Sequence, residues 1–213
     1  MSAVDREQLP KRTGLTLIAH VTITRLLTLI ALNLVFCLTA LPLVTLPNAI
    51  AALYRCIGLV LREEEFPLFR TYIKAFQSEF LKTLAAGWVV LILLFGAIVC
   101  AVFYWSIHAD AAILFAMMCA VLAIYLYAVC CNLFYMLSRM RLSLGPLLKN
   151  AFLLVFLQPI KKTAICLISL LVLGLCAWWF PRTLPVVVLI GFSLAALTAC
   201  YGVRDKIEQS VIS

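Results

Sequence analysis

Few residues of this chain could carry out chemistry, and they are scattered along it. His20 and His108 lie far apart, in an N-terminal segment and in a loop between apolar runs. We therefore expect each imidazole to be solvated or interfacial rather than a ligand. Three consecutive glutamates at 63–65 could form a metal or partner site. We favour the alternative, a solvated loop whose charge benefits the N-terminus of the following helix.

The sequence motifs of nucleotide and hydrolytic chemistry are absent. No glycine is followed by lysine, so there is no Walker A loop, and neither HExxH nor GxSxG occurs. The nine cysteines lie in apolar segments without a CxxC pair, which is typical of small packing residues in a reduced chain. We expect no catalytic residue, no metal and no cofactor, and we expect that the protein is not an enzyme.

Polar residues inside apolar segments are the remaining candidates. Asn33 lies within a charge-free run, where an interhelical hydrogen bond is a more common role than a substrate contact. Arg55 could bind a lipid phosphate, a substrate anion or a helix C-terminal carbonyl. We favour a fourth interpretation, in which Arg55 extends to the cytoplasmic interface two turns before Arg62.

The segments that carry these residues are those of a membrane protein. The chain is 66% hydrophobic and 12% charged, with a mean hydropathy of +1.14, whereas a soluble domain is about half apolar. A helix needs about 20 apolar residues to cross a bilayer. Charge-free runs near this length occur at 26–54, 83–109, 111–138, 163–181 and 183–203.

The distribution of cations predicts the topology. The net charge is +8, and the Lys and Arg residues that produce it lie between the apolar runs. This distribution is typical of cytoplasmic loops and does not indicate nucleic-acid binding. Residues 139–162 carry five cations and no acid, so we place them inside, and counting back places residues 62–82 inside as well. The basic N-terminal tail also favours the inside. This parity requires that the chain goes out and returns within residues 26–61.

Residues 41–55, LPLVTLPNAIAALYR, are the place where the chain can turn. We expect residues 41–47 to form an extended leg, because a residue that precedes proline avoids the α region, and we expect a short helix from Asn48. Non-helical backbone at membrane depth must be shielded by other helices, so this hairpin should be packed inside the bundle. The candidate structural or functional residues are Asn33, Pro42, Thr45, Pro47, Asn48 and Arg55.

Residues 66–82 have a helical period with an aromatic face and a cationic face. Phe69, Tyr72, Ile73, Phe76 and Phe80 form the first, and cations at steps of four form the second. This pattern predicts an amphipathic helix in the headgroup plane at the cytoplasmic side. Residues 145–159, which are more apolar, form a second segment of this interfacial type.

We therefore expect an all-α, polytopic membrane helix bundle with five to six transmembrane segments, including the Pro-broken hairpin. The single integral membrane domain divides into a cytoplasmic tail with an interfacial helix (1–25), the broken helical hairpin (26–61), the amphipathic helix (66–82), transmembrane helices (83–106, 110–138, 163–181 and 183–203) and a cytoplasmic tail (204–213).

Residues 32–84 resemble the YesL-like family of bacterial integral membrane proteins, a domain of unknown function. The features that carry the resemblance are Asn33-Leu34, Leu41-Pro42 with Thr45, residues 49–54 and the Phe- and Lys-rich segment that ends near Lys82. Family members commonly accompany oligosaccharide ABC importers. The resemblance therefore implies an accessory protein of the bacterial plasma membrane that serves carbohydrate uptake. The distribution of cations predicts that this multi-pass protein has both termini in the cytoplasm.

Two functions remain open. The first is a non-enzymatic accessory or regulatory protein that binds the permease subunits of an oligosaccharide ABC importer. The chain has no EAA-x3-G coupling motif, so it is not expected to be the permease itself. The alternative is an autonomous small-solute transporter or channel, alone or as an oligomer. Beyond such partners we expect contact with the lipid bilayer and none with nucleic acid.

Overall fold

A computed structural model describes residues 15–107, 109–140, 143–157, 167–171, 174 and 184–211, and within them every regular element is helical. The expected all-α class is therefore confirmed. In chain order the elements are α2 (Leu15–Thr24), α3 (Leu26–Ala40), the 3-10 turn η1 (Leu43–Thr45), α4 (Leu46–Val60), α5 (Leu68–Gln77), α6 (Phe80–Trp105), α7 (Asp110–Arg139), α8 (Leu144–Leu157), α10 (Leu184–Val186), the π-helical turn η2 (Val187–Gly191) and α11 (Phe192–Val211).

Three of the described helical stretches are long and apolar enough to cross a bilayer: Leu43–Val60, Phe80–Trp105 and Asp110–Arg139. The pair Ile18–Thr24 and Leu26–Ala40, bent by 85° at the break between them, would make a fourth span. The chain is thus a membrane protein with three to four candidate spans. Most of the expected span 163–181 lies outside the described residues.

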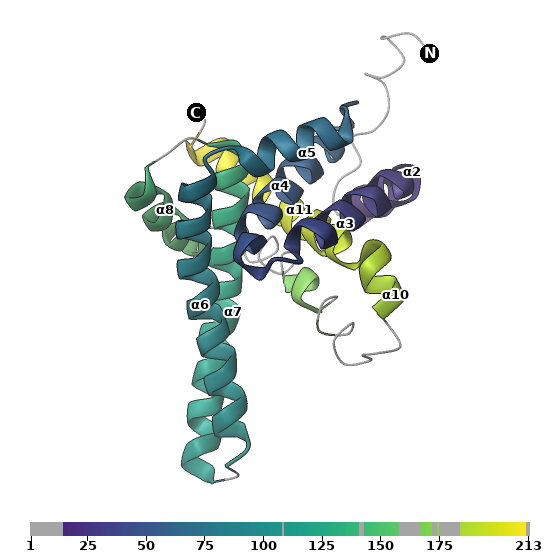
Figure 1. The fold of residues 1–213 in the computed structure, drawn as a ribbon. Helices are drawn as coiled ribbons and strands as arrows, with labels where there is room; N and C mark the ends of the chain where they lie inside the picture. Colours follow the sequence, from purple (N-terminus) through teal and green to yellow (C-terminus); the bar gives the residue numbers. More distant parts are fainter. Residues whose placement is uncertain are drawn as a thin grey trace.

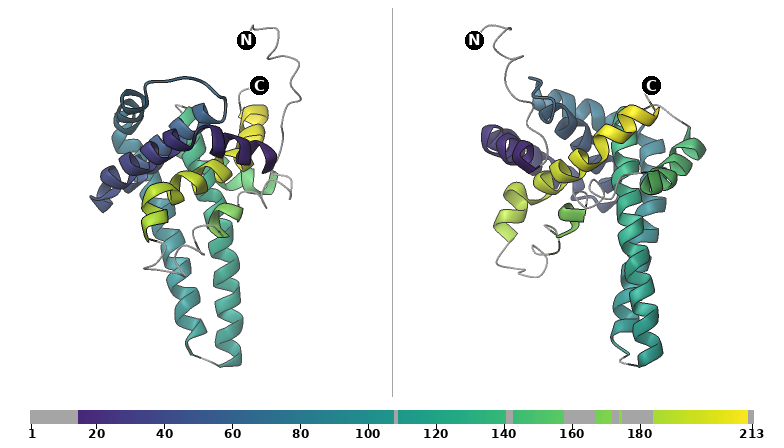
Figure 2. Two further views of the ribbon diagram at one scale, coloured as in Figure 1. Left: turned by 90° about the vertical axis from the view of Figure 1, so that its right-hand side faces the viewer. Right: turned by 180° about the vertical axis from the view of Figure 1, so that it is seen from behind.

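The helices are arranged as a compact group from which one long hairpin projects. α6 and α7 run side by side and extend well beyond the other elements in all three views (Figure 1, Figure 2). The remaining helices gather around the end of the hairpin where α6 begins and α7 ends. Most of the projecting part of the α6–α7 hairpin is exposed apolar surface, whereas its other end is packed.

α4 is the most enclosed of the candidate spans. It contacts α3, α5, α6, α7 and α11, and 61% of its span is buried, against 22% and 28% for α6 and α7. Its small residues allow these close approaches: Ala49, Ala51, Ala52 and Gly58 are all buried. The expectation that this short arm is packed inside the bundle is confirmed, although its path across a membrane stays a prediction.

The break before α4 differs from the extended leg that the sequence predicted. Pro42 is extended, with φ −76° and ψ 93°, but Leu41 before it is helical, and the chain then forms the 3-10 turn η1. α4 already begins at Leu46, two residues before the expected start at Asn48. The reason is that proline is tolerated in the first turn of a helix, where its missing N–H has no intrahelical partner to lose; Pro47 occupies that place.

Two further boundaries differ from the expected ones. α5 ends at Gln77, and Glu79 has a left-handed φ of 48°, so that Phe80 begins α6 instead of completing the face of the amphipathic helix. Residues 204–211, expected to be a tail, continue α11 to Val211. Residues 1–14 of the N-terminal segment lie outside the described residues.

The end of α4 provides a first prediction. Glu63 has φ 56°, and the N–H groups of Glu63 and Glu64 donate to the carbonyls of Val60 and Leu59, the bond pattern of a helix C-terminus that prefers glycine in the left-handed position. Glu63→Gly is expected to raise the free energy of unfolding by about 1 kcal/mol. In detergent, the melting temperature should rise by about 2–4 °C.

Glu65→Gly is the matched control. It removes the same charge from the same loop at a residue without a positive φ, so its melting temperature should stay constant or fall slightly. An equal rise in both variants would mean that charge, and not backbone strain, sets the stability of this loop.

Candidate functional site

Asn33 joins α3 to the π-helical turn near the C-terminus of the chain. Its Nδ2 donates to the carbonyls of Val187 and Val188 at 2.8 and 2.7 Å, and its Oδ1 accepts from the N–H of Ser193 at 2.8 Å. The Asn33 side chain is completely buried. The interhelical hydrogen bond expected for this residue is present, and Asn33 acts as a structural contact across more than 150 residues of sequence.

Polar side chains donate hydrogen bonds to backbone carbonyls in and beside the broken turn, residues 41–45. Thr45 Oγ1 donates to the carbonyls of Thr39 and Pro42, at 2.7 and 2.8 Å. Trp88 on α6 donates its indole N–H to the carbonyl of Val44 at 3.0 Å. Because a carbonyl without a partner is costly in an apolar medium, these bonds stabilise the break.

Pro47 and Asn48 fix the start of α4 against α6. Asn48 Nδ2 donates to the carbonyl of Phe80 at 3.3 Å, whereas its buried Oδ1 has no partner among the described residues. A Cβ atom added at Gly87 would lie 2.5 Å from Pro47 Cβ, so α4 and α6 approach each other more closely than any side chain larger than glycine permits at this point.

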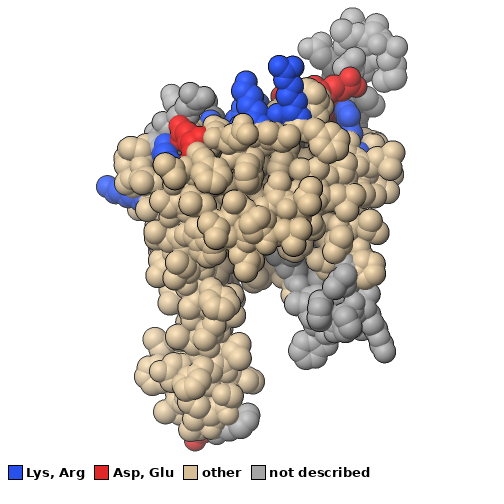
Figure 3. All heavy atoms as spheres, in the orientation of Figure 1, with Lys and Arg blue, Asp and Glu red and all other residues tan. Residues whose placement is uncertain are grey.

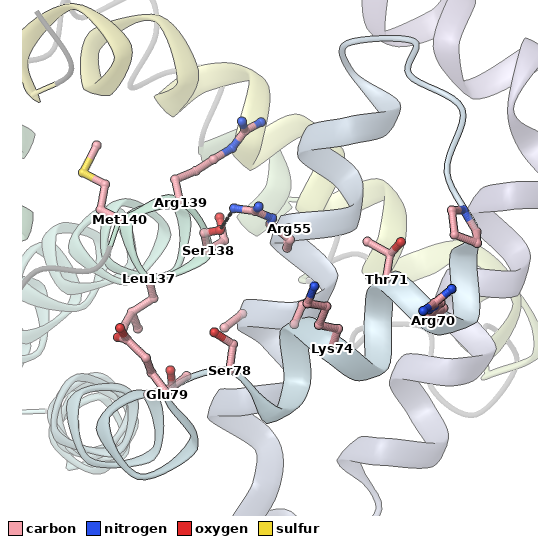
Figure 4. Close-up of a pocket in the computed structure, with 14 residues that line it drawn as sticks. Arg55, Arg70, Thr71, Lys74, Ser78, Glu79, Leu137, Ser138, Arg139 and Met140 are labelled. Carbon is pink, nitrogen blue, oxygen red and sulfur yellow. Dashed lines mark hydrogen bonds between the residues drawn. The ribbon is translucent and has the colours of Figure 1, made fainter.

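Arg55 lies in the C-terminal half of α4 and reaches α7. Its Nη1 donates to the carbonyl of Ser138 at 2.6 Å, in the last turn of α7, where helix carbonyls lack intrahelical partners. Of the roles left open by the sequence, a bond to a helix C-terminal carbonyl is the one observed. The remaining donors of the guanidinium face the space beside it (Figure 4).

That space is a cavity of about 590 Å³ between α4, α5 and the end of α7, which we call the basic pocket. Four cations line it, and the Lys74 ammonium extends from α5 toward Arg55 (Figure 4). The charged and hydroxyl residues of the lining are Arg55, Arg70, Thr71, Lys74, Ser78, Glu79, Thr83, Ser138 and Arg139.

The charge of the basic pocket is positive. Glu79 is its single acidic residue, and Glu79 accepts a 2.7 Å bond from Lys82. Arg139 is a half-buried cation of the lining: its Nη2 lies 2.8 Å from the position of a Cβ added at Gly58, and its buried Nε and Nη2 atoms have no hydrogen-bond partner among the described residues. Figure 3 shows Lys and Arg side chains gathered at this end of the molecule.

Tyr72 holds α5 in place at the pocket. It is fully buried, and its hydroxyl lies 2.7 Å from Thr39 Oγ1 and donates to the carbonyl of Ala49 at 3.3 Å. Burial raises the pKa of Tyr72 further above physiological pH, where a tyrosine hydroxyl is in any case protonated and can donate. Phe69 and Ile73 on the same helix are exposed. The aromatic face predicted for this segment is therefore divided between core and surface.

The six candidate residues do not form one site. Pro42 and Thr45 belong to the broken turn, Pro47 and Asn48 to the contact with α6, and Asn33 to the contact with η2 and α11. Arg55 lines a cavity in the described part of the chain.

Sequence reasoning missed the pocket partners of Arg55. The spacing of Arg70 and Lys74 predicts a cationic helix face, but nothing in the sequence indicates that this face lies against α4 and the end of α7. Among the described residues no group of three or more His, Cys, Asp or Glu could hold a metal ion, and His108 lies outside them.

The helices and the basic pocket define an α-helical membrane protein with a cation-lined hollow at one end. Residues 29–107 match the family model "Protein of unknown function, DUF624". YesL-like proteins are in this family, so the resemblance is confirmed over a segment that runs from α3 to the end of α6. No curated protein and no solved structure matches the chain significantly.

Proposed function

We propose that the protein is a non-enzymatic accessory subunit in the bacterial plasma membrane, and that the α6–α7 hairpin docks against a transmembrane helix of an oligosaccharide-importer permease. The nature of this partner rests on the resemblance to YesL-like proteins. The observation that carries the docking proposal is a groove on the projecting part of the hairpin.

The hairpin groove has a volume of about 280 Å³. Lipid would cover any exposed apolar helix face, but a groove with small residues favours a protein helix, because alanines let two backbones approach closely. Three of its lining residues are alanines, at positions 101, 116 and 120, and the others are larger. The lining residues are Ala101, Val102, Trp105, Ala116, Met117 and Ala120.

The distribution of charge supports an orientation. The basic pocket lies at the end where α7 finishes, whereas Asp110 begins α7 at the far end of the hairpin. By the positive-inside rule, we place the pocket and both termini in the cytoplasm. The proposal includes five to six transmembrane segments and an α5 helix that lies at the membrane interface. The exposed side chains of Phe69 and Ile73 on α5 would contact lipid.

Site-directed photo-crosslinking in native membranes tests the proposal. A photoreactive amino acid at Ala120, in the groove, should crosslink to a permease subunit of a sugar importer when cells grow on the corresponding oligosaccharide. The partner is identified by mass spectrometry. The same probe at Val121, an exposed neighbour outside the groove lining, should not form this product.

A pair of bulky variants complements the crosslinks. Ala120→Trp fills the groove and should abolish co-purification of the permease subunit, while Val121→Trp should retain it; both sites are exposed, so both variants should fold. Two results would overturn the proposal: equal crosslinking from the two positions, or a crosslink only to a second copy of this chain.

The basic pocket favours a second candidate, an autonomous small-solute transporter. Its test is flux into proteoliposomes that contain the purified protein alone. A specific flux that is lost on Arg55→Ala would replace the accessory proposal with this one, whereas absence of flux leaves the hairpin experiment to decide.

A further inference from the structure

We propose that the basic pocket binds a phosphate group that belongs to a larger molecule, held by Arg55, Arg70 and Lys74. Two sources of this group can reach the pocket: the headgroup of an anionic phospholipid and a phosphorylated solute of the cytoplasm. The proposal is independent of what the α6–α7 hairpin binds.

Uncompensated charge is the first argument. Arg70 and Lys74 occupy successive turns of α5, where like charges repel each other, and no acidic side chain among the described residues pairs with either. Glu79 faces the same cavity, but Lys82 already neutralises it at 2.7 Å. An anion in the cavity would relieve the repulsion between the cations that line it.

The fixed orientation of Arg55 is the second argument. One guanidinium nitrogen donates to the Ser138 carbonyl at 2.6 Å, and a guanidinium has five N–H donors in a rigid plane. The bond to α7 thus orients the remaining donors without using them. Planar, paired donors of this kind suit phosphate oxygens, and a side chain that is already oriented loses less entropy when a ligand binds.

The chemistry of the lining selects phosphate over a carboxylate. The three proposed ligands come from two helices, Arg55 from α4 and Lys74 with Arg70 from α5, so they can approach an anion from different directions. The hydroxyls of Thr71 and Ser78 add further donors on the α5 side. A tetrahedral phosphate directs its oxygens to several sides and therefore suits donors on two helices better than a carboxylate, whose two oxygens lie in one plane.

The size of the cavity indicates that the phosphate is part of a larger molecule. About 590 Å³ is within the range of pockets that hold small organic ligands, about 300–1,000 Å³, and is far more than a single phosphate fills. The pocket also lies at the charged end of the molecule (Figure 3). The positive-inside rule places this end at the cytoplasmic face of the membrane, where lipid headgroups and cytoplasmic solutes would both have access.

Ligand-dependent melting of the purified full-length protein in a neutral maltoside detergent tests the proposal. One arm adds dioleoyl phosphatidylglycerol as mixed micelles, with dioleoyl phosphatidylcholine as its zwitterionic control. The other arm adds glucose 6-phosphate, with potassium chloride at the same ionic strength as its control. At least one anionic probe should raise the melting temperature in a saturable manner, and the arm that responds identifies the source.

The decisive variant is Arg70→Gln with Lys74→Gln, because both side chains are exposed and their loss should leave folding intact. Charge-assisted hydrogen bonds contribute enough that the apparent affinity should fall about tenfold or more. Arg62→Gln with Lys149→Gln removes two cations outside the pocket lining and should change the affinity less than about twofold.

Arg55→Gln should also abolish the response, with a lower starting stability because the Ser138 contact is lost. The proposal is overturned if neither phosphate-bearing probe stabilises the protein beyond its matched control. It is equally overturned if the α5 double variant responds like the wild type, since binding would then depend on general surface charge.

Discussion

Gly87→Ala is expected to destabilise the protein strongly, although it adds a single methyl group. The added Cβ would lie 2.5 Å from Pro47 Cβ and 3.2 Å from Phe134 Cζ. Pro47 cannot move aside by changing rotamer, because its ring is closed and it occupies the first turn of the buried helix α4. The contact must be relieved by separating α4 from α6, which disturbs the Asn48 bond to Phe80 as well.

Overpacking in a tight core typically lowers the free energy of unfolding by about 1–3 kcal/mol. This loss exceeds the gain of about 0.5–1 kcal/mol that alanine usually brings over glycine inside a helix. The measurement is the melting temperature in detergent, followed by size-exclusion chromatography.

Gly96→Ala is the matched control for this prediction. Gly96 lies on the same helix, and a Cβ there would meet nothing within 4 Å. This variant should be as stable as the wild type or slightly more so. If Gly87→Ala were also neutral, α4 and α6 could not be packed as closely as described.

Local patterns were enough to predict much of this fold. The long apolar runs predicted α6 and α7 to within three residues at each end, 83–106 and 110–138 against Phe80–Trp105 and Asp110–Arg139. Pro42 and Pro47 predicted the break before α4, because a missing N–H and a fixed φ act within a few residues of the proline.

Contacts between distant segments could not be predicted in the same way. Nothing near Pro47 in sequence indicates that Gly87 lies against it, and nothing near Arg55 indicates the Ser138 carbonyl, which is 83 residues away. The basic pocket therefore could not be predicted, although the sequence indicates both Arg55 and the cationic helix face that carries Arg70 and Lys74. Periodicity shows that Arg70 and Lys74 share a helix face, but which element that face meets is decided by packing.

The break illustrates the same division. The sequence predicted non-helical backbone within the bundle and the need to shield it. It did not predict that Thr45 and Trp88 would supply the donors. Short-range rules thus predict where the backbone is irregular, and tertiary contacts explain how its carbonyl groups find hydrogen-bond donors.

Asn33→Leu is expected to have an effect as large as that of Gly87→Ala, by a different mechanism. The leucine would fill a similar volume, but the carbonyls of Val187 and Val188 and the N–H of Ser193 would lose their partner together. Each hydrogen bond of this kind contributes about 0.6–1.7 kcal/mol in a membrane, so the loss should be about 2–4 kcal/mol. The melting temperature in detergent should fall by several degrees, while Asn150→Leu, at a half-buried position on α8, should have little effect.

The location of the damage distinguishes a lost hydrogen-bond network from general loosening. Cys200 on α11 is completely buried beside the Tyr54 carbonyl, and Cys130 is buried on α7. Asn33 bonds η2 and the start of α11 to α3, so its loss should detach α11 before the other helices. Below the melting temperature, the rate of alkylation should then rise at Cys200 but not at Cys130. Equal acceleration at both cysteines, measured by peptide mass spectrometry, would show that Asn33 stabilises the whole bundle and not the attachment of α11.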